Sequence, residues 1–379
     1  MKKLYWQSHR FSRLTLLFVC LLSFVGIITV EKFKTYIPQN YYHEKLAATL
    51  LTKQCMLAIK KYRLKKHIPI EYENDPQHSG LIGEAFNFLT TGHGSLTAKQ
   101  TSINPNFSAL IVAWLKSIGI KAGDTIALGM NGSYPALNIA VLAAAKTLQL
   151  KPILIVNMSS TQWGGNIPRL LWLDMLSILN KQDLIPYTPI AATIAETKNQ
   201  LKNNPRKSNY YLLKLIKKYK IPFIDTIDNS DIITKRMNIY YEQAKKNHSP
   251  IKIYINVGSS VTVHRKLGKH KNIKPGLNTI IPIAAATSDS VMLRFMKNGI
   301  PIINLTNIET LAEKYELPIS PSTHPILGKG NIFFEKHYNT YLAITYLFAI
   351  LVFLILSTIL NKARFNRHYN SGVKTTHEE

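Results

Sequence analysis

The stretch that decides the fold runs from residue 125 to residue 156 and reads TIALGMNGSYPALNIAVLAAAKTLQLKPILIV. It begins and ends with short apolar runs, at 125–130 and 152–156, and residues 135–148 between them follow an apolar helical spacing. Two buried strands that are joined by a long crossover helix pair in parallel. This βαβ pattern predicts an α/β fold with a parallel sheet and flanking helices on both of its faces.

The same alternation extends to both sides of this unit. Further strands are expected at 252–257 and 301–305, and further helices at 107–118, 171–180, 232–246, 290–297 and 308–315. The stretch from 191 to 210 is polar and predicts a surface excursion or a boundary between two lobes, near 191–225. The pattern leaves open whether the two halves share one sheet or form two lobes.

Two apolar segments are candidates for membrane helices. Residues 14–30 (LTLLFVCLLSFVGIITV) follow four basic residues and lack a small-x-small cleavage site, which favours an uncleaved anchor over a signal peptide. Residues 341–360 (YLAITYLFAILVFLILSTIL) are long enough to span a bilayer, and three basic residues follow them closely. Because short flanking segments rich in Lys and Arg stay in the cytoplasm, both ends of the chain are expected there.

These segments predict how the chain is organised. The expected parts are a cytoplasmic N-terminus (1–13), a transmembrane helix (14–30), a juxtamembrane helix and linker (31–75), an extracytoplasmic α/β domain (76–340), a second transmembrane helix (341–360) and a cytoplasmic tail (361–379). The expected location is the cytoplasmic, or inner, membrane, with two spans and the main domain outside the cytoplasm.

The chain is strongly basic, with 47 Lys and Arg against 21 Asp and Glu and a net charge of +26. Residues 1–30 contribute +4 and residues 341–379 contribute +2, so +20 falls in the part expected outside the cytoplasm. A translocated domain meets little nucleic acid, so nucleic acid is not an expected partner. The charge instead favours anionic lipid headgroups or an anionic polymer of the cell envelope. A basic surface that binds nothing is the alternative.

Several classes of chemistry lack their sequence signals. The only cysteines are Cys20 and Cys55, too few for a disulfide framework or a thiolate zinc cage. The sequence contains no Gly-x-x-x-x-Gly-Lys-Ser/Thr phosphate loop and no His-Glu-x-x-His zinc motif, and Ser133 does not fit Gly-x-Ser-x-Gly. No metal and no cofactor are therefore expected.

The first candidate site is the loop after the strand at 125–130. Asn131, Gly132 and Ser133 stand where the carboxyl end of a strand meets the next helix, which is where ligands bind in open α/β sheets. Gly132 permits a close approach, Ser133 stands at the expected N-cap, and Pro135 falls in the first helical turn. An anion is therefore expected at this helix N-terminus. The alternative is that Ser133 only caps the helix.

The second candidate site follows the strand at 252–257. Gly258 and Ser259 form a turn, and a basic run that includes Arg265 and Lys266 comes directly after it. Arg pairs with carboxylates through two hydrogen bonds and Lys acts as a point charge, so this loop is expected to bind carboxylates. The alternative is an exposed basic loop without a ligand.

A catalytic interpretation is weaker, and the chain is expected to be a binding protein rather than an enzyme. Ser133 is the candidate nucleophile. A hydrolytic triad would need a histidine and an aspartate beside it, and the candidates are His78, His93 and His264 with Asp174, Asp228 and Asp289.

Several short motifs are found together in one known family. They include Gly94-Ser95-Leu96, Ala98-Lys99, Asn104-Pro105-Asn106-Phe107, Gly132-Ser133-Tyr134-Pro135-Ala136-Leu137-Asn138, Trp163-Gly164, Trp172-Leu173-Asp174-Met175, Asn256-Val257-Gly258 and the run 299–308. In these motifs the chain resembles the poly-gamma-glutamate system protein family, over about residues 76–330. It departs from that family in the polar stretch 191–210 and at Ser259-Ser260, where glycine is typical.

The resemblance implies a membrane-anchored accessory component of poly-γ-glutamate synthesis or export, a capsule-type polymer of the cell envelope. The implied partners are membrane lipid, the anionic polymer and other membrane components of the machinery that makes it. Two other functions are kept open: an envelope hydrolase or transferase that acts on the polymer through Ser133, and a membrane-tethered scaffold without a ligand.

Overall fold

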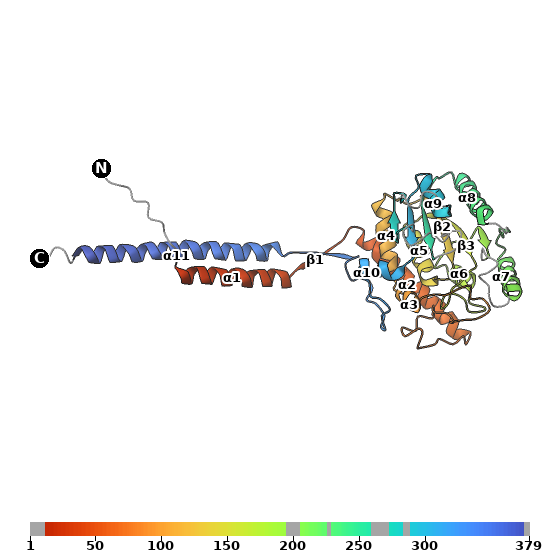
Figure 1. Cartoon of the computed structure of the whole chain (residues 1–379), viewed down its shortest axis with the longest axis horizontal. Coiled ribbons are helices and arrows are strands. Elements are labelled where there is room, and N and C mark those ends of the chain that lie inside the picture. Colours follow the sequence, from red (N-terminus) through yellow and green to blue (C-terminus); the bar gives the residue numbers. More distant parts are fainter. Residues whose placement is uncertain (1–11, 195–204, 226–228, 259–272, 283–288, 375–379) are drawn as a thin grey trace. The chain divides into compact units, whose positions relative to one another are not determined.

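The computed structural model describes residues 12–194, 205–225, 229–258, 273–282 and 289–374. The chain forms two compact units (Figure 1). One unit contains residues 39–333, and the other is built from the two ends of the chain, up to Pro38 and from Phe334 onward.

A single six-stranded sheet forms the centre of the larger unit, and its strand order is β4-β3-β2-β5-β7-β6. The strands are β2 (Thr125–Asn131), β3 (Lys151–Asn157), β4 (Ala191–Thr193), β5 (Ile251–Val257), β6 (Gly276–Asn278) and β7 (Ile302–Leu305). All neighbours pair in parallel except β6, which is antiparallel to β7. The predicted α/β fold is confirmed, and the sheet is parallel as predicted except at β6. The two halves of the sequence share this sheet.

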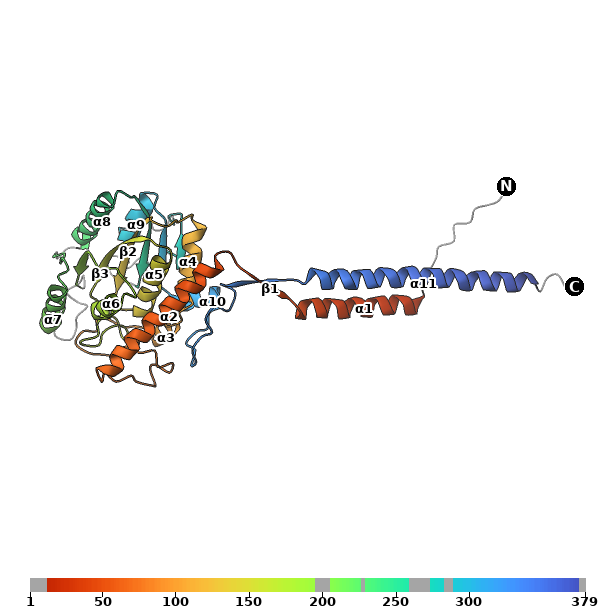
Figure 2. The ribbon, with the colours of Figure 1, turned by 180° about the vertical axis from the view of Figure 1, so that it is seen from behind.

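Helices cover both faces of this sheet. They are α2 (Tyr42–Lys65), α3 (Leu96–Ser102), α4 (Phe107–Ser117), α5 (Pro135–Thr147), α6 (Trp172–Lys181), α7 (Pro205–Lys218), α8 (Asn229–Lys246), α9 (Val291–Lys297) and α10 (Ile308–Lys314). On one side α2, which runs in front of α5 in Figure 2, packs on α4, α5 and α6, and α4 also packs on α5. On the other side α8 packs on β3, and α9 packs on β5 and β7.

Apolar packing on each face explains why these segments form these elements. Every residue of β2 is buried, as expected for a central parallel strand. On the side of α8 and α9, the rings of Tyr254 and Phe295 stack with centroids 4.8 Å apart, and Tyr240 packs edge-on against both. The Tyr240 hydroxyl donates a hydrogen bond of 2.7 Å to the carbonyl of Leu128 in β2. This aromatic cluster ties α8 and α9 to the middle of the sheet.

The helix that precedes the sheet in the sequence is part of this core. The segment 31–75 was expected to be a juxtamembrane helix and linker, and it contains α2. Ala48, Cys55 and Ile59 of α2 are fully buried. Their spacing of seven and four residues places them on one helix face, and α2 packs with that face against α4 and α5.

The ends of the chain form a separate antiparallel pair. Its elements are α1 (Arg13–Lys32), β1 (Thr35–Pro38), β8 (Phe334–His337) and α11 (Thr340–Lys374). Strand pairing joins Thr35 to His337, and in the helices the rings of Phe18 and Phe353 lie 4.5 Å apart. Two stretches, 13–32 and 340–363, are long and apolar enough to cross a membrane. The predicted helices at 14–30 and 341–360 are therefore present, although α11 continues to Lys374.

Candidate functional site

Two loops meet where β2 and β3 end. Asn131 and Asn157 are the last residues of these strands and are paired in register. The Oδ1 atom of each accepts a hydrogen bond of 2.9 Å from the backbone N–H two residues later, at Ser133 and Ser159. These Asx turns bend both loops over the edge of the sheet. The N–H of Gly132 then donates to the Ser159 carbonyl at 2.9 Å, which joins the loops.

A buried lysine lies beneath the two loops. Lys99, from α3, is 1% exposed. Its Nζ atom donates to the carbonyl of Ser133 and lies 2.9 Å from Oγ1 of Thr161. The same Nζ lies 3.8 Å from the centroid of the Tyr134 ring. Burial lowers the pKa of Lys99 to about 7. The lysine therefore links three segments that are far apart in the sequence.

Glycines allow the backbone to approach this lysine closely. A Cβ atom at Gly164 would lie 2.5 Å from Oγ of Ser160 and 2.9 Å from the carbonyl oxygen of Gly132. A Cβ atom at Gly94 would lie 2.8 Å from the carbonyl oxygen of Gln162 and 3.3 Å from Cε of Lys99. Any side chain at either position would push the loops apart. We call Lys99, Ser133, Tyr134 and Thr161 the lysine cluster.

The predicted residues of the first loop lie in this cluster, with a different arrangement from the one expected. Ser133 is 3% exposed, and its Oγ accepts a hydrogen bond of 3.2 Å from the N–H of Thr161. The N-cap residue of α5 is Tyr134 and not Ser133, and it makes no side-chain capping bond. The N–H groups of Gly132 and Ser133 are already bonded within the protein, so an anion at this helix end would have to use other donors.

The two predicted loops are adjacent. Gly258 follows β5 with φ +79°, and a Cβ atom there would lie 2.5 Å from Oδ1 of Asn131. The carboxyl ends of β2 and β5 therefore meet where the sequence placed both sites. Ser259, Arg265 and Lys266 lie outside the described residues, so carboxylate binding by that loop stays a prediction.

The candidate triad partners of Ser133 have other neighbours. The rings of His78 and Tyr72 lie 4.6 Å apart, and those of His93 and Phe86 lie 6.0 Å apart. Asp174 is bonded to Lys218 and Tyr219, and Asp289 forms an ion pair of 2.7 Å with Arg294. His264 and Asp228 lie outside the described residues. A triad through Ser133 thus finds no support among the histidines and aspartates that the structure describes.

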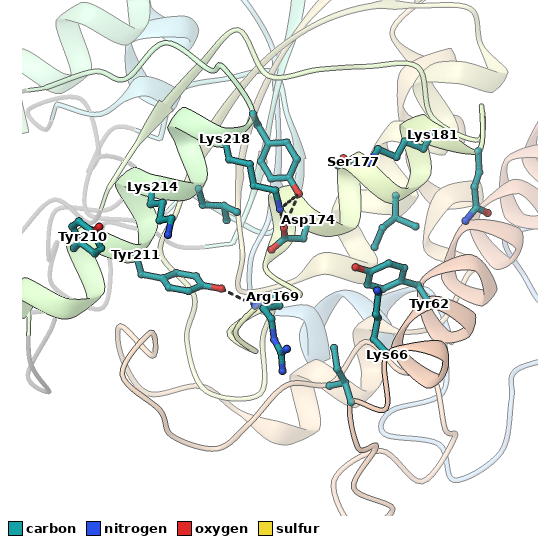
Figure 3. A pocket seen from close by; sticks show the side chains of 15 residues that line it. Tyr62, Lys66, Arg169, Asp174, Ser177, Lys181, Tyr210, Tyr211, Lys214 and Lys218 are labelled. Atoms are coloured by element: carbon teal, nitrogen blue, oxygen red, sulfur yellow. Dashed lines mark hydrogen bonds and ion pairs between the residues drawn. The ribbon is translucent and has the colours of Figure 1, made fainter.

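A basic cavity lies between α2, α6 and α7 (Figure 3). Its volume is about 720 Å³. The residues that carry its chemistry are five cationic ones (Lys66, Arg169, Lys181, Lys214 and Lys218), four tyrosines (Tyr62, Tyr210, Tyr211 and Tyr219) and Asp174. Figure 3 shows these side chains arranged around the cavity from separate elements. We call this the basic cavity.

One carboxylate is neutralised inside the basic cavity. Asp174 lies in the first turn of α6, where its Oδ2 accepts from the N–H of Leu171 at 3.1 Å. Its Oδ1 accepts from the Tyr219 hydroxyl at 2.6 Å and from Nζ of Lys218 at 3.3 Å. Burial, and then the hydrogen bond to Asp174, raise the pKa of Tyr219. Among the described residues that line the cavity, Asp174 is the only acidic one, so the positive charge is in excess.

The basic cavity was not predicted from the sequence. Lys66 belongs to a basic run at the end of α2. Lys214 and Lys218 belong to α7, which lies within the stretch 191–225 that was predicted to contain a surface excursion or a lobe boundary. The sequence pattern that could have predicted α7 is the spacing of Leu212, Leu215 and Ile216, which are buried. That spacing gives α7 one apolar face and one basic face.

Groups of three or more His, Cys, Asp or Glu side chains that could hold a metal ion do not occur in the described part of the chain. No family model, no curated protein and no solved structure matches this sequence. The basic cavity and the lysine cluster are the two candidate sites in the described part of the chain.

Proposed function

We propose that this protein is a membrane-anchored binding protein for a carboxylate-rich polymer and serves as an accessory component of poly-γ-glutamate synthesis or export. The observation that carries this proposal is the basic cavity, whose described lining has five cationic residues and one carboxylate that is already paired. The resemblance to the poly-gamma-glutamate system proteins suggests the pathway, and the cationic lining of the cavity suggests that the protein binds carboxylates.

The cavity has the donors that a chain of carboxylates requires. The Arg169 guanidinium matches a carboxylate through two parallel hydrogen bonds, while Lys66 and Lys214 contribute mobile point charges. The tyrosines add hydroxyl donors and apolar ring faces. A volume of about 720 Å³ lies within the usual range of about 300–1,000 Å³ for ligand sites.

A second cavity continues the path along α6. It has a volume of about 400 Å³ and shares Ser177, Lys181 and Tyr219 with the basic cavity. Its remaining lining includes Lys220, beyond the end of α7. A polymer bound in the basic cavity would therefore find Lys181 and Lys220 in the lining of the neighbouring cavity, a reach that a small anion would not need.

In this role the protein would lie in the cytoplasmic membrane, with both ends in the cytoplasm and the α/β domain outside. Two helices of sufficient length and apolarity support the anchor, and their antiparallel pairing is what two spans with ends on one side require. The basic residues that flank both helices support the orientation. A polymer exported at the membrane would then meet the domain as it emerges.

The test is binding of poly-γ-glutamate to the full-length protein in nanodiscs of zwitterionic lipid. We expect binding to weaken steeply with salt, because screened contacts have a range of about 8 Å at physiological ionic strength. Replacing Lys66, Lys181 and Lys214 together with Gln should weaken binding at least about tenfold. The matched control replaces Lys121, Lys151 and Lys252, three exposed lysines outside the cavity lining, in the same way.

The control separates a site from general attraction, because both triple variants lose the same charge. Equal weakening in the two variants would show that the cavity is not the binding site. An absence of binding at low salt would leave the tethered scaffold as the better function. Release of shortened polymer during the assay, lost on Ser133→Ala, would instead favour the envelope hydrolase or transferase.

A further inference from the structure

The lysine cluster has no part in the proposed binding function, yet burying its lysine costs free energy of hydration. An ammonium group as deeply buried as that of Lys99 loses most of its hydration, and its described contacts are a carbonyl, a hydroxyl and an aromatic ring face. Buried lysines with this environment are easily held as the neutral amine. A neutral amine beside a hydroxyl group is a base beside a nucleophile.

We propose that Lys99 and Thr161 form a nucleophile–base pair for acyl transfer, with Thr161 Oγ1 attacking the carbonyl carbon of an ester or amide. The geometry is a separation of 2.9 Å between Nζ and Oγ1, within the reach that proton transfer requires. This site is independent of the basic cavity, so each can fail without the other.

The hydrogen-bond geometry fits a neutral amine. One N–H of Lys99 donates to the Ser133 carbonyl, which holds the amine in place. In the structure Nζ also donates to Oγ1 of Thr161 at 2.9 Å, and a neutral Nζ at that distance accepts the proton of the Thr161 hydroxyl once its lone pair turns toward Oγ1. The lowered pKa, about 7, leaves a large fraction of the amine neutral at physiological pH.

The proposed reaction balances with water as the only co-reactant. Thr161 Oγ1 forms a bond to the acyl carbon while its proton passes to Nζ of Lys99. Collapse of the intermediate breaks the bond to the leaving alcohol or amine, which takes that proton. Water then attacks the threonine ester and gives a proton to Nζ of Lys99. The bond between the acyl carbon and Oγ1 breaks, Oγ1 takes that proton back from Nζ, and a carboxylic acid leaves.

Thr161 is a better nucleophile than Ser133 in this structure. Thr161 is partly exposed, whereas Ser133 is buried. The contact of Lys99 with Ser133 is to the backbone carbonyl, and the Ser133 hydroxyl oxygen already accepts the N–H of Thr161. Gly94, which lies against both Thr161 and Lys99, keeps the space beside the hydroxyl free of a side chain.

The experiment uses a β-lactone probe, an acyl electrophile that adds its whole mass on ring opening. The full-length protein in detergent is incubated with the probe at pH 8, and the modified residue is found by mass spectrometry of peptides. We expect modification of Thr161, absent in Thr161→Val and about a hundredfold slower in Lys99→Arg, whose guanidinium stays protonated and supplies no base.

The pH profile tests the role of Lys99 itself. The labelling rate should rise with pH, with a midpoint near 7, and then level off. Among the described residues, the ionisable side chain of Tyr134 contacts Lys99, and burial raises the pKa of Tyr134 to about 12. Glu309 of α10 acts electrostatically on Tyr134 and accepts from the Ser95 hydroxyl at 2.8 Å, whereas burial is what lowers the pKa of Lys99. Glu309→Gln should therefore leave the midpoint in place.

Three outcomes would overturn the proposal. These are no modification of Thr161, modification of Ser133 in its place, or undiminished labelling of Thr161 in Lys99→Arg. Thermal unfolding of each variant shows that it is folded, and Thr97→Val, at an exposed position in the same helix, is the matched control that should label normally.

Discussion

Burial of the ionisable Lys99 side chain makes the stability of the protein depend on pH. In the unfolded chain a lysine titrates near 10.4, whereas burial lowers the pKa of Lys99 to about 7. Between these two values the unfolded chain holds a proton that the folded chain lacks. Stability therefore rises with pH across this window, and below about pH 7 the cost of burying the charge is at its largest.

We expect this to appear as a pH-dependent difference between the wild type and Lys99→Met. The free energy of unfolding of the wild type should gain up to about 1.4 kcal/mol per pH unit relative to the variant between pH 7 and pH 10. Urea unfolding of the full-length protein in detergent at pH 6, 8 and 9.5 measures it. Lys121→Met, at an exposed position, should give a difference that does not change with pH.

The residues of the site were predictable only in part. Asn131 and Gly258 follow central strands, and the carboxyl ends of parallel strands share one edge, so their meeting could be expected. The contacts of Lys99 could not be, because Ser133 and Thr161 are 34 and 62 residues away from it in the sequence. No local spacing encodes such a contact.

At the scale of elements, the helix pair α1 and α11 has a defined register. The Oγ atoms of Thr15 and Ser357 lie 3.1 Å apart, and the Tyr346 hydroxyl donates to Oγ1 of Thr29 at 3.2 Å. Gly26 faces the Tyr346 ring, where an added Cβ would lie 3.1 Å from it. Small and hydroxyl-bearing residues of this kind are typical of contacts between membrane helices.

This register predicts a disulfide. In a Cys20→Ser background, Thr15→Cys with Ser357→Cys should form an intramolecular bond on mild oxidation, because the two side chains already meet. Gel mobility after protease cleavage between the helices measures it. Leu14→Cys with Ser357→Cys is the control, since Leu14 is 78% exposed. Equal cross-linking of both pairs would show that the register is wrong.

The elements themselves were largely predictable. β2, β3, β5 and β7 begin and end within one residue of the predicted positions, because buried parallel strands appear as continuous apolar runs. The short strands β4 and β6 were missed. Each has three residues and forms at an edge of the sheet, so pairing with a neighbour, and not its own sequence, decides its conformation.

At the scale of the whole molecule, the proposed topology has a direct test. Protease added to intact spheroplasts should digest the segment 31–340, while the basic ends, including Lys2 and Lys374, stay protected. Protection follows if both apolar helices cross the membrane. Permeabilised cells are the control in which all parts become accessible. Digestion of the tail at Lys374 in intact spheroplasts would exclude the two-span arrangement.

The ribbon of β1 and β8 has a consequence for the order of folding. Pairing Thr35 with His337 in an otherwise unfolded chain would close a loop of about 300 residues, at an entropic cost of about 5 kcal/mol. The larger unit removes most of that cost, because the N–H of Gln39 donates to the carbonyl of Phe333 at 2.8 Å and brings the ends of the loop together. We infer that β1 and β8 pair last, after the larger unit has folded. In a chain still emerging from the ribosome, the six-stranded sheet would then fold before α11 has been synthesised.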